Sequence, residues 1–286
     1  MIDEAAPLAL SRLVNLYPVH VLRESWAFKG KKDEIVEEIV RRAERRNLKV
    51  FLDAYLSCCK QHVYLFSHRN DPADLPRFRI PDAEKEYDVT EGATRRVLYV
   101  AKLDYRVIFT EPLREETLTF LWPIRLDFTR SNLVVRFVTM EKDLRTYVVE
   151  PSRTVWRSLT ETQVLDHLHG VLTDLTRLNI NRGLKHLWDA DRIDGLLAKF
   201  QKPDSTQTET MNGEKGLKQT YPNLYREVRN APLSNVVFKV LNKEGEMKLG
   251  LSSFSADASK GSLSFYTYSE RPGDTVSLVE EIIRHN

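Results

Sequence analysis

Cysteine is scarce in this chain of 286 residues, and the two that occur are the neighbours Cys58 and Cys59. Adjacent residues of a helix point in directions too different for ordinary disulfide geometry. Because disulfides belong mainly to oxidising compartments, this pattern predicts an intracellular protein, cytoplasmic or nuclear, in a reducing compartment.

A long apolar run is also missing. No stretch approaches the roughly 18 residues that a membrane-spanning helix needs. The first residues, MIDEAAPLALSRL, are acidic where a secretory signal would be basic. We therefore expect no membrane span, no membrane partner and no cleaved leader.

Familiar catalytic motifs are absent as well. The sequence has no glycine-rich phosphate loop, no G-x-S-x-G and no H-E-x-x-H, which argues against the commonest nucleotide-binding, hydrolase and zinc-protease classes. We expect a non-enzymatic protein without a cofactor. The alternative left open is a metal-dependent nuclease or hydrolase that uses strand carboxylates such as Asp104 and Asp127.

The net charge is small, at +2 with a pI near 8.4, so any affinity for nucleic acid has to come from local clustering. Hydrophobic residues make up 42% and charged residues 29%, a balance typical of folded globular proteins. A chain of this length favours two domains over one.

Helical spacing of apolar residues dominates residues 1–69. It predicts short helices at 8–16 and 19–27, a long one at 32–46 and a fourth at 48–66. The apolar stripe of the long helix consists of Ile35, Val36, Ile39, Val40 and Ala43. We expect residues 1–69 to form an all-helical bundle.

Residues 70–96 are rich in proline and acidic residues and predict a linker. From residue 97 the apolar period changes to about two, which predicts strands at 97–109, 118–128, 133–137 and 144–150. Thr160 and Gln163 form a capping box at the start of a helix, and further helices are expected over 184–200.

The polar segment 201–217 predicts a disordered loop. Three more strands, at 236–241, 247–254 and 263–268, and a helix at 275–284 follow. Runs of strands between runs of helices predict an α+β class: the N-terminal bundle precedes a larger domain, residues 97–286, of antiparallel sheet packed with helices.

The densest basic cluster surrounds the long helix. Residues of this type bind phosphates, so the cluster predicts a contact with DNA or RNA. Its members are Lys29, Lys31, Lys32, Arg41, Arg42, Arg45, Arg46 and Lys49.

The same charges have a purely structural interpretation. Acidic residues at the start of the helix and arginines at its end follow the order that the helix dipole favours. Glu37 with Arg41 and Glu38 with Arg42 have the spacing of stabilising pairs. The turn Lys29–Lys32 lies outside these pairs, at a helix entrance where free N–H groups attract anions.

Two further candidates have strong structural alternatives. His167 and His169 cannot face one ion from one helix, and the spacing of Cys58, Cys59, His62 and His68 fits no zinc pattern, so we expect no metal site. Strand aromatics can form a stacking platform or a protein interface, but they also build cores. These are Phe120, Trp122, Phe128, Tyr266 and Tyr268.

The order of parts resembles the centromere protein N/Chl4 family of inner-kinetochore proteins. The resemblance rests on LYPVHVLRESWAFKGKKDEIVEEIVRRAERR and, more loosely, on SNLVVRFVTMEKDLRTYVV. It implies a death-fold or pyrin-like N-terminal bundle that engages nucleosomal DNA, and an α+β body that pairs with a partner protein.

The leading hypothesis is therefore a DNA-binding assembly protein whose bundle contacts backbone phosphates, while its α+β body contacts a protein partner or a second copy. The alternative in the same area is an interaction adaptor that binds no nucleic acid.

Overall fold

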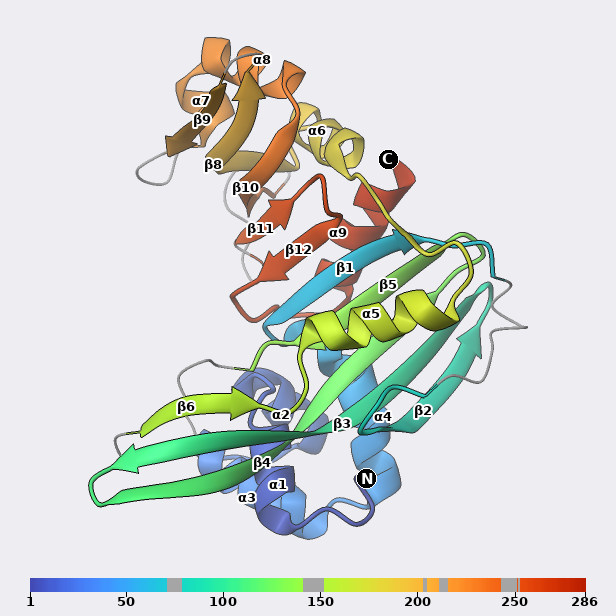
Figure 1. The fold of residues 1–286 in the computed structure, drawn as a ribbon, viewed down its shortest axis with the longest axis vertical. Coiled ribbons are helices and arrows are strands. Elements are labelled where there is room, and N and C mark those ends of the chain that lie inside the picture. Colours follow the sequence, from blue (N-terminus) through green and yellow to red (C-terminus); the bar gives the residue numbers. More distant parts are fainter. Residues whose placement is uncertain (71–78, 141–151, 203–204, 211–215, 243–250, 252) are drawn as a thin grey trace. The chain divides into compact units, whose positions relative to one another are not determined.

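The computed structural model describes residues 1–70, 79–140, 152–202, 205–210, 216–242, 251 and 253–286. Within these residues the chain is a mixture of helices and antiparallel strands, which confirms the expected α+β class (Figure 1). It divides into two compact units. The first unit contains Met1–Cys59 and His68–Leu175, and the second contains Lys60–Ser67 and Thr176–Asn286.

Four helices open the first unit: α1 (Pro7–Val14), α2 (Val19–Trp26), α3 (Lys32–Arg42) and α4 (Arg45–Tyr55), followed by the 3₁₀ turn η1 (Leu56–Cys58). Their apolar stripes meet at an aromatic cluster in which the Phe51 ring lies 5.1 Å from that of Tyr17 and 5.7 Å from that of Trp26. The Tyr17 hydroxyl donates to the Leu52 carbonyl at 2.9 Å, so this buried polar group is satisfied.

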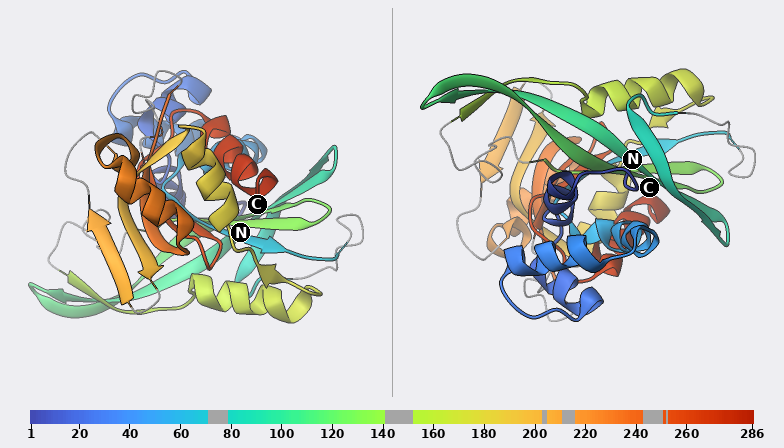
Figure 2. Two further views of the ribbon diagram at one scale, coloured as in Figure 1. Left: turned by 90° about the horizontal axis from the view of Figure 1, so that it is seen from above. Right: turned by 90° about the horizontal axis from the view of Figure 1, so that it is seen from below.

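The sheet of the first unit has the antiparallel order β2 (Ala83–Glu91), β3 (Thr94–Thr110), β4 (Leu113–Phe128), β5 (Asn132–Val138). β6 (Ser152–Arg157) pairs with β3 beyond the end of β2. Helices α1–α4 lie on one face of this sheet and α5 (Glu161–Val171) on the other (Figure 2). Burial at every position of β4 from Phe120 to Leu126 agrees with a strand covered on both faces.

A buried ionic network joins the bundle to this sheet. Arg125 of β4 and Arg136 of β5 are directly opposite in the strand register, and both are buried. Like charges in such a position repel. Asp127 lies between them and accepts from Arg125 at 3.1 Å and from Arg136 at 3.2 Å. Arg125 also donates to the backbone carbonyl of Asp53 in α4 at 3.1 Å.

The second unit has a separate strand order: β1 (Gln61–Ser67), β12 (Ser262–Phe265), β11 (Ser253–Asp257), β10 (Leu233–Val240), β8 (Ile193–Lys202), β9 (Ser205–Thr210), with β7 (Thr176–Arg177) beside β1. A row of aromatic rings crosses it: Trp188, Phe238, Phe254 and Phe265, with successive centroids 5.1, 5.6 and 5.7 Å apart. Such cross-strand contacts hold neighbouring strands in register.

Four helices complete the second unit: α6 (Asn181–Asp189), α7 (Leu217–Thr220), α8 (Pro222–Asn230) and α9 (Pro272–Arg284). α6 and α9 approach closely at Gly183, where an added Cβ would lie 2.9 Å from the carbonyl carbon of Ile282. Asp194 is almost fully buried, and it accepts from the Trp188 indole at 2.9 Å and from the backbone N–H of Lys218 at 2.9 Å. These contacts fix α6 and α7 against β8.

The helix expected at 32–46 is four residues shorter, and the next helix, expected from residue 48, begins three residues earlier. Ala43 is extended (φ −69°, ψ 129°), so α3 ends at Arg42 and α4 starts at Arg45. The break lets both helices turn their apolar residues toward one core, since Ile39 of α3 and Leu48 of α4 are each fully buried. No glycine or proline in the sequence marks it.

Several other segments differ from their predicted structure. The helix expected to reach residue 66 ends at Tyr55, and 61–67 form β1, whose buried residues mostly alternate. Part of the expected linker forms β2. Residues 193–202, expected to be helical or in the disordered loop, form β8, and 205–210 form β9. The predicted strand 144–150 and most of 247–254 lie outside the described residues.

Other expectations agree with the structure. The alternating segments at 97–109, 118–128 and 133–137 are strands, and a helix closes the chain. The predicted capping box is present: the Thr160 hydroxyl accepts from the Gln163 N–H at 3.3 Å, and the Gln163 carboxamide accepts from the Thr160 N–H at 2.8 Å.

Replacing Asp127 with Asn should lower the free energy of unfolding by roughly 3 kcal/mol at pH 7, because two buried arginines lose their shared carboxylate. Burial alone would raise the pKa of Asp127, but Arg125 and Arg136 outweigh it and lower that pKa. The stabilisation is therefore present above the unfolded value of about 3.9 and is lost as the pH falls through the folded value.

Chemical denaturation of wild type and Asp127→Asn at pH 7 and at pH 3 measures this difference, which should shrink at the lower pH. Asp166→Asn is the matched control, because Asp166 is exposed and makes no hydrogen bond or ion pair in the described part of the chain. Equal stability of Asp127→Asn and Asp166→Asn would contradict the structural role of the network.

Candidate nucleic-acid interface and a basic groove

The turn before α3 is shaped by hydrogen bonds that leave its lysines exposed. Gly30 has φ +130°, and its carbonyl accepts from Arg23 at 2.8 Å. The Lys31 backbone N–H donates to the Glu34 carboxylate at 2.9 Å, an arrangement that satisfies one free N–H at the helix entrance. The ammonium groups of Lys29 and Lys31 make no hydrogen bond or ion pair with any described residue, and both side chains are exposed.

Lys32 differs from its neighbours in the turn. Its Nζ donates to the Asn15 carbonyl at 2.6 Å, and the side chain is half-buried. This bond connects the start of α3 to the end of α1, so Lys32 has a structural use inside the bundle.

The arginines at the end of α3 share one carboxylate. Glu38 accepts from Arg41 and, at 2.5 Å, from Arg42. The expected pair of Glu38 with Arg42 is confirmed, whereas Arg41 pairs with Glu38 and not with Glu37. Both arginines remain more than 60% exposed, with side-chain exposures of 66% and 62%.

Arg45 and Arg46 occupy the first turn of α4, which contains no acidic residue. The preceding Glu44 makes no capping hydrogen bond through its side chain. An uncapped helix start with two cations and free N–H groups favours an anion. Neither arginine forms an ion pair within the described ranges.

Lys49 has a structural role, because it forms two ion pairs. Its Nζ contacts Asp3 at 2.6 Å and Glu86 at 2.9 Å, and only 19% of the side chain is exposed. Burial opposes the charge, but hydrogen bonds from Lys49 to Asp3 and Glu86 raise its pKa. Of the eight predicted residues, four therefore make an ion pair or a hydrogen bond. The other four make none with any described residue, and they are Lys29, Lys31, Arg45 and Arg46.

These four residues stand at the two ends of α3. The helix has eleven residues, and at 1.5 Å per residue it is about 16 Å long. The major groove of B-DNA is about 12 Å wide. Along the chain, the two pairs of cations are therefore separated by a helix that is longer than this groove is wide.

The candidate metal ligands are not brought together. Within the described residues, no group of three or more His, Cys, Asp or Glu side chains is placed to hold a metal ion. Burial raises the pKa of the Cys59 thiol well above its usual value. The Nδ1 of His68 accepts from the Asn70 N–H at 3.1 Å, so it belongs to a turn.

The candidate strand carboxylates form ion pairs or hydrogen bonds with other residues of the sheet. Asp127 is held by two arginines, as described above, and Asp104 accepts from the Thr119 hydroxyl at 2.5 Å. Of the candidate aromatic residues, Phe120, Trp122 and Phe128 are buried core residues. Tyr266 and Tyr268 of the second unit are 58% and 38% exposed.

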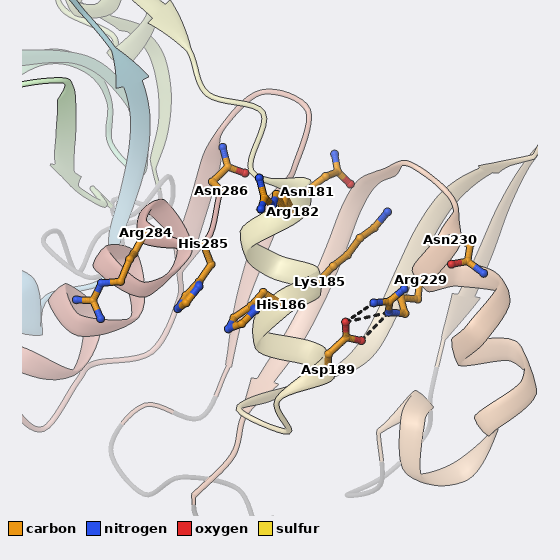
Figure 3. Close-up of a pocket in the computed structure, with 10 residues that line it drawn as sticks. All are labelled: Asn181, Arg182, Lys185, His186, Asp189, Arg229, Asn230, Arg284, His285 and Asn286. Atoms are coloured by element: carbon orange, nitrogen blue, oxygen red, sulfur yellow. Dashed lines mark hydrogen bonds and ion pairs between the residues drawn. The ribbon is translucent and has the colours of Figure 1, made fainter.

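The second unit contains a basic groove that the sequence did not reveal. It crosses the exposed face of α6 between the ends of α8 and α9 and has a volume of about 660 Å³ (Figure 3). We call it the α6 groove, and its lining includes Arg182, Lys185, His186, Asp189, Arg229 and His285. The only available signal was the polar spacing of 182, 185, 186 and 189, opposite the buried Leu184, Leu187 and Trp188.

No protein-family model matches the chain, and no curated protein or solved structure matches it. Among the described helices, none combines the length and the apolar content that crossing a bilayer requires.

Replacing Lys32 with Met should lower the free energy of unfolding by about 1.5 kcal/mol, because a charge-assisted hydrogen bond to the Asn15 carbonyl is lost. Lys29→Met makes the same chemical change three residues before the start of α3, where the amine has no partner among the described residues, and should leave stability within about 0.5 kcal/mol. Thermal or urea unfolding of both variants measures the contrast. Equal effects would show that the Lys32 bond contributes nothing to stability.

Proposed function

We propose that this protein binds nucleic acid through its N-terminal helices and assembles with a protein through its α+β body, without catalysis. The observation that carries the proposal is the pair of Lys29 and Lys31, exposed at a helix entrance and without an ion pair among the described residues. Arg45 and Arg46 add two further cations in the first turn of α4. Contacts of this kind go to backbone phosphates and do not read sequence.

The resemblance to the centromere protein N/Chl4 family supports the same proposal. In that comparison, α1–α4 take the place of the pyrin-like, death-fold bundle, and nucleosomal DNA is the ligand that the resemblance implies. A catalytic role is left out of the proposal because Asp127 and Asp104, the candidate carboxylates, are bound within the sheet.

The double variant Lys29→Glu/Lys31→Glu should stay folded and bind duplex DNA much more weakly. The slope of log K against log salt is about −0.9 per phosphate contact, so the loss of two contacts should make it less negative by about 1.8. Fluorescence anisotropy with a labelled duplex at several salt concentrations measures both quantities. Lys32 is kept because of its bond to Asn15.

A charge-matched control is Lys102→Glu/Lys199→Glu, because both lysines are exposed and lie outside the bundle, on β3 and β8. An equal loss in the two variants would mean that overall charge, and not the turn, governs binding. A wild-type protein without salt-sensitive DNA affinity would favour the adaptor hypothesis.

The protein contact is proposed for the second unit, where Tyr266 and Tyr268 are exposed. Aromatic residues are enriched at protein interfaces. The His62 ring lies edge-on to Tyr266 at 6.2 Å, and the Lys60 amine lies 5.4 Å from the Tyr268 ring. Aromatic side chains held by neighbours lose little entropy on binding, which suits an interface.

If the partner is a second copy, sedimentation velocity should show an average sedimentation coefficient that rises with protein concentration. Tyr266→Ser/Tyr268→Ser should abolish the rise, while Tyr221→Ser, at another exposed tyrosine of this unit, should preserve it. A wild-type monomer at all concentrations would exclude self-association.

A further inference from the structure

The α6 groove has more positive than negative side chains. Its lining includes the cations Arg182, Lys185 and Arg229 and one acidic side chain, that of Asp189. Figure 3 shows Lys185 extending from α6 toward the α8 side, where Arg229 and Asp189 lie together. Arg284 extends away from α6 in the same view and is not counted here. The three cations therefore exceed the carboxylate by two charges.

The Asp189 carboxylate already has partners within the protein. It accepts from Arg229 through both carboxylate oxygens, at 2.7 Å from Nε and 2.5 Å from Nη2, and also from the Tyr225 hydroxyl. This bidentate contact fixes the plane of the guanidinium. Only two of the five N–H groups of Arg229 are needed for it, so the others are left for a ligand.

Lys185 is held in a position where nearby negative charge does not balance the charge of its amine. Its Nζ donates to the Ala231 carbonyl at 2.8 Å, which orients the amine and uses one of its three N–H groups. Burial and the nearby Arg229 lower the pKa of Lys185, and the more weakly acting Asp189 does not cancel them. An anion beside this amine would stabilise its charged form.

The α9 side of the groove is lined by two stacked imidazoles. The rings of His186 and His285 are 3.7 Å apart and tilted by 14°. Figure 3 shows them on the opposite side of α6 from Lys185 and Arg229. The groove thus lies between α8 and α9.

We propose that the α6 groove is a binding site for a phosphomonoester, held by Arg182, Lys185 and Arg229. A phosphomonoester carries a charge of about −1.5 to −2 at pH 7, which matches the excess of two positive side chains. A nucleic-acid backbone has one charge per phosphate and requires an extended basic surface. Three cations that line one groove favour the monoester, since Arg binds phosphate through paired N–H groups.

The site lies within the second unit and does not depend on the nucleic-acid contact proposed for the first. Loss of DNA binding in the Lys29/Lys31 variant and loss of phosphate binding in a groove variant are separate results. The two proposals therefore succeed or fail independently.

Isothermal titration of the full chain with inorganic phosphate and with O-phosphoserine tests the site at pH 7.5 and constant ionic strength. Wild type should bind saturably. Lys185→Gln should weaken binding on the order of tenfold, because one charge-assisted hydrogen bond is lost. Lys185→Arg should retain most of it. Lys199→Gln removes the same charge from an exposed position on β8, outside the groove, and should bind like wild type.

Circular dichroism checks that each variant is folded. If Lys185→Gln unfolds, Arg182→Gln takes its place, because Arg182 is exposed and makes no hydrogen bond or ion pair among described residues. Binding equal to wild type in the folded groove variant would overturn the proposal. The same heat from sodium chloride at matched ionic strength would also overturn it.

Two further titrations identify the source of the phosphate. Tighter binding of a phosphoserine peptide than of O-phosphoserine supports a phosphorylated protein as the source, whereas equal affinities support a small phosphomonoester. A blunt duplex with 5′-hydroxyl ends carries no monoester. If it displaces phosphate from wild type, the ligand is a nucleic-acid backbone and the monoester proposal is wrong.

Discussion

The first unit depends on one buried contact, that of Asp127 with Arg125 and Arg136. The two arginines are directly opposite on neighbouring strands, so without the carboxylate their repulsion would oppose the pairing of β4 with β5. Arg125 also reaches the Asp53 carbonyl in α4. The contact that permits the sheet therefore also fixes the bundle on it, and with the bundle the turn Lys29–Lys31.

The second unit uses carboxylates in two different ways. Asp194 is buried and satisfied by N–H donors from an indole and from the backbone of α7, so it holds structure together. Asp189 is exposed at the end of α6 and orients Arg229 without cancelling the neighbouring cations. The net charge of the chain is only +2. Which cations remain to bind a ligand therefore depends on where the acidic residues form their hydrogen bonds and ion pairs.

The sequence was informative where one local pattern decides the structure. Alternation predicted the strands at 97–109 and 118–128, and Thr160 with Gln163 predicted the start of α5. It was less informative at 61–67, a short apolar run compatible with a helix, because the strand pairs with β12, which lies far along the chain.

Lys29 and Lys31 could be predicted as exposed cations. The partners of Lys32 and Lys49 could not, because Asn15 and Glu86 belong to other elements. The α6 groove combines residues of three helices, and its one signal in the sequence is the polar face of α6.

The two positive surfaces differ in their exposure to solvent, and this difference decides what each can bind. Lys29 and Lys31 are exposed, so their interactions are screened by water and salt, which suits weak, salt-sensitive contacts along a nucleic-acid backbone. Lys185 is half-buried beside a fixed guanidinium, where electrostatic interactions are stronger and desolvation has already occurred. A site of that kind gains most from one compact dianion. The physical environment of the cations, more than their number, therefore separates the proposed interface for a polymer from the proposed site for a single phosphate group.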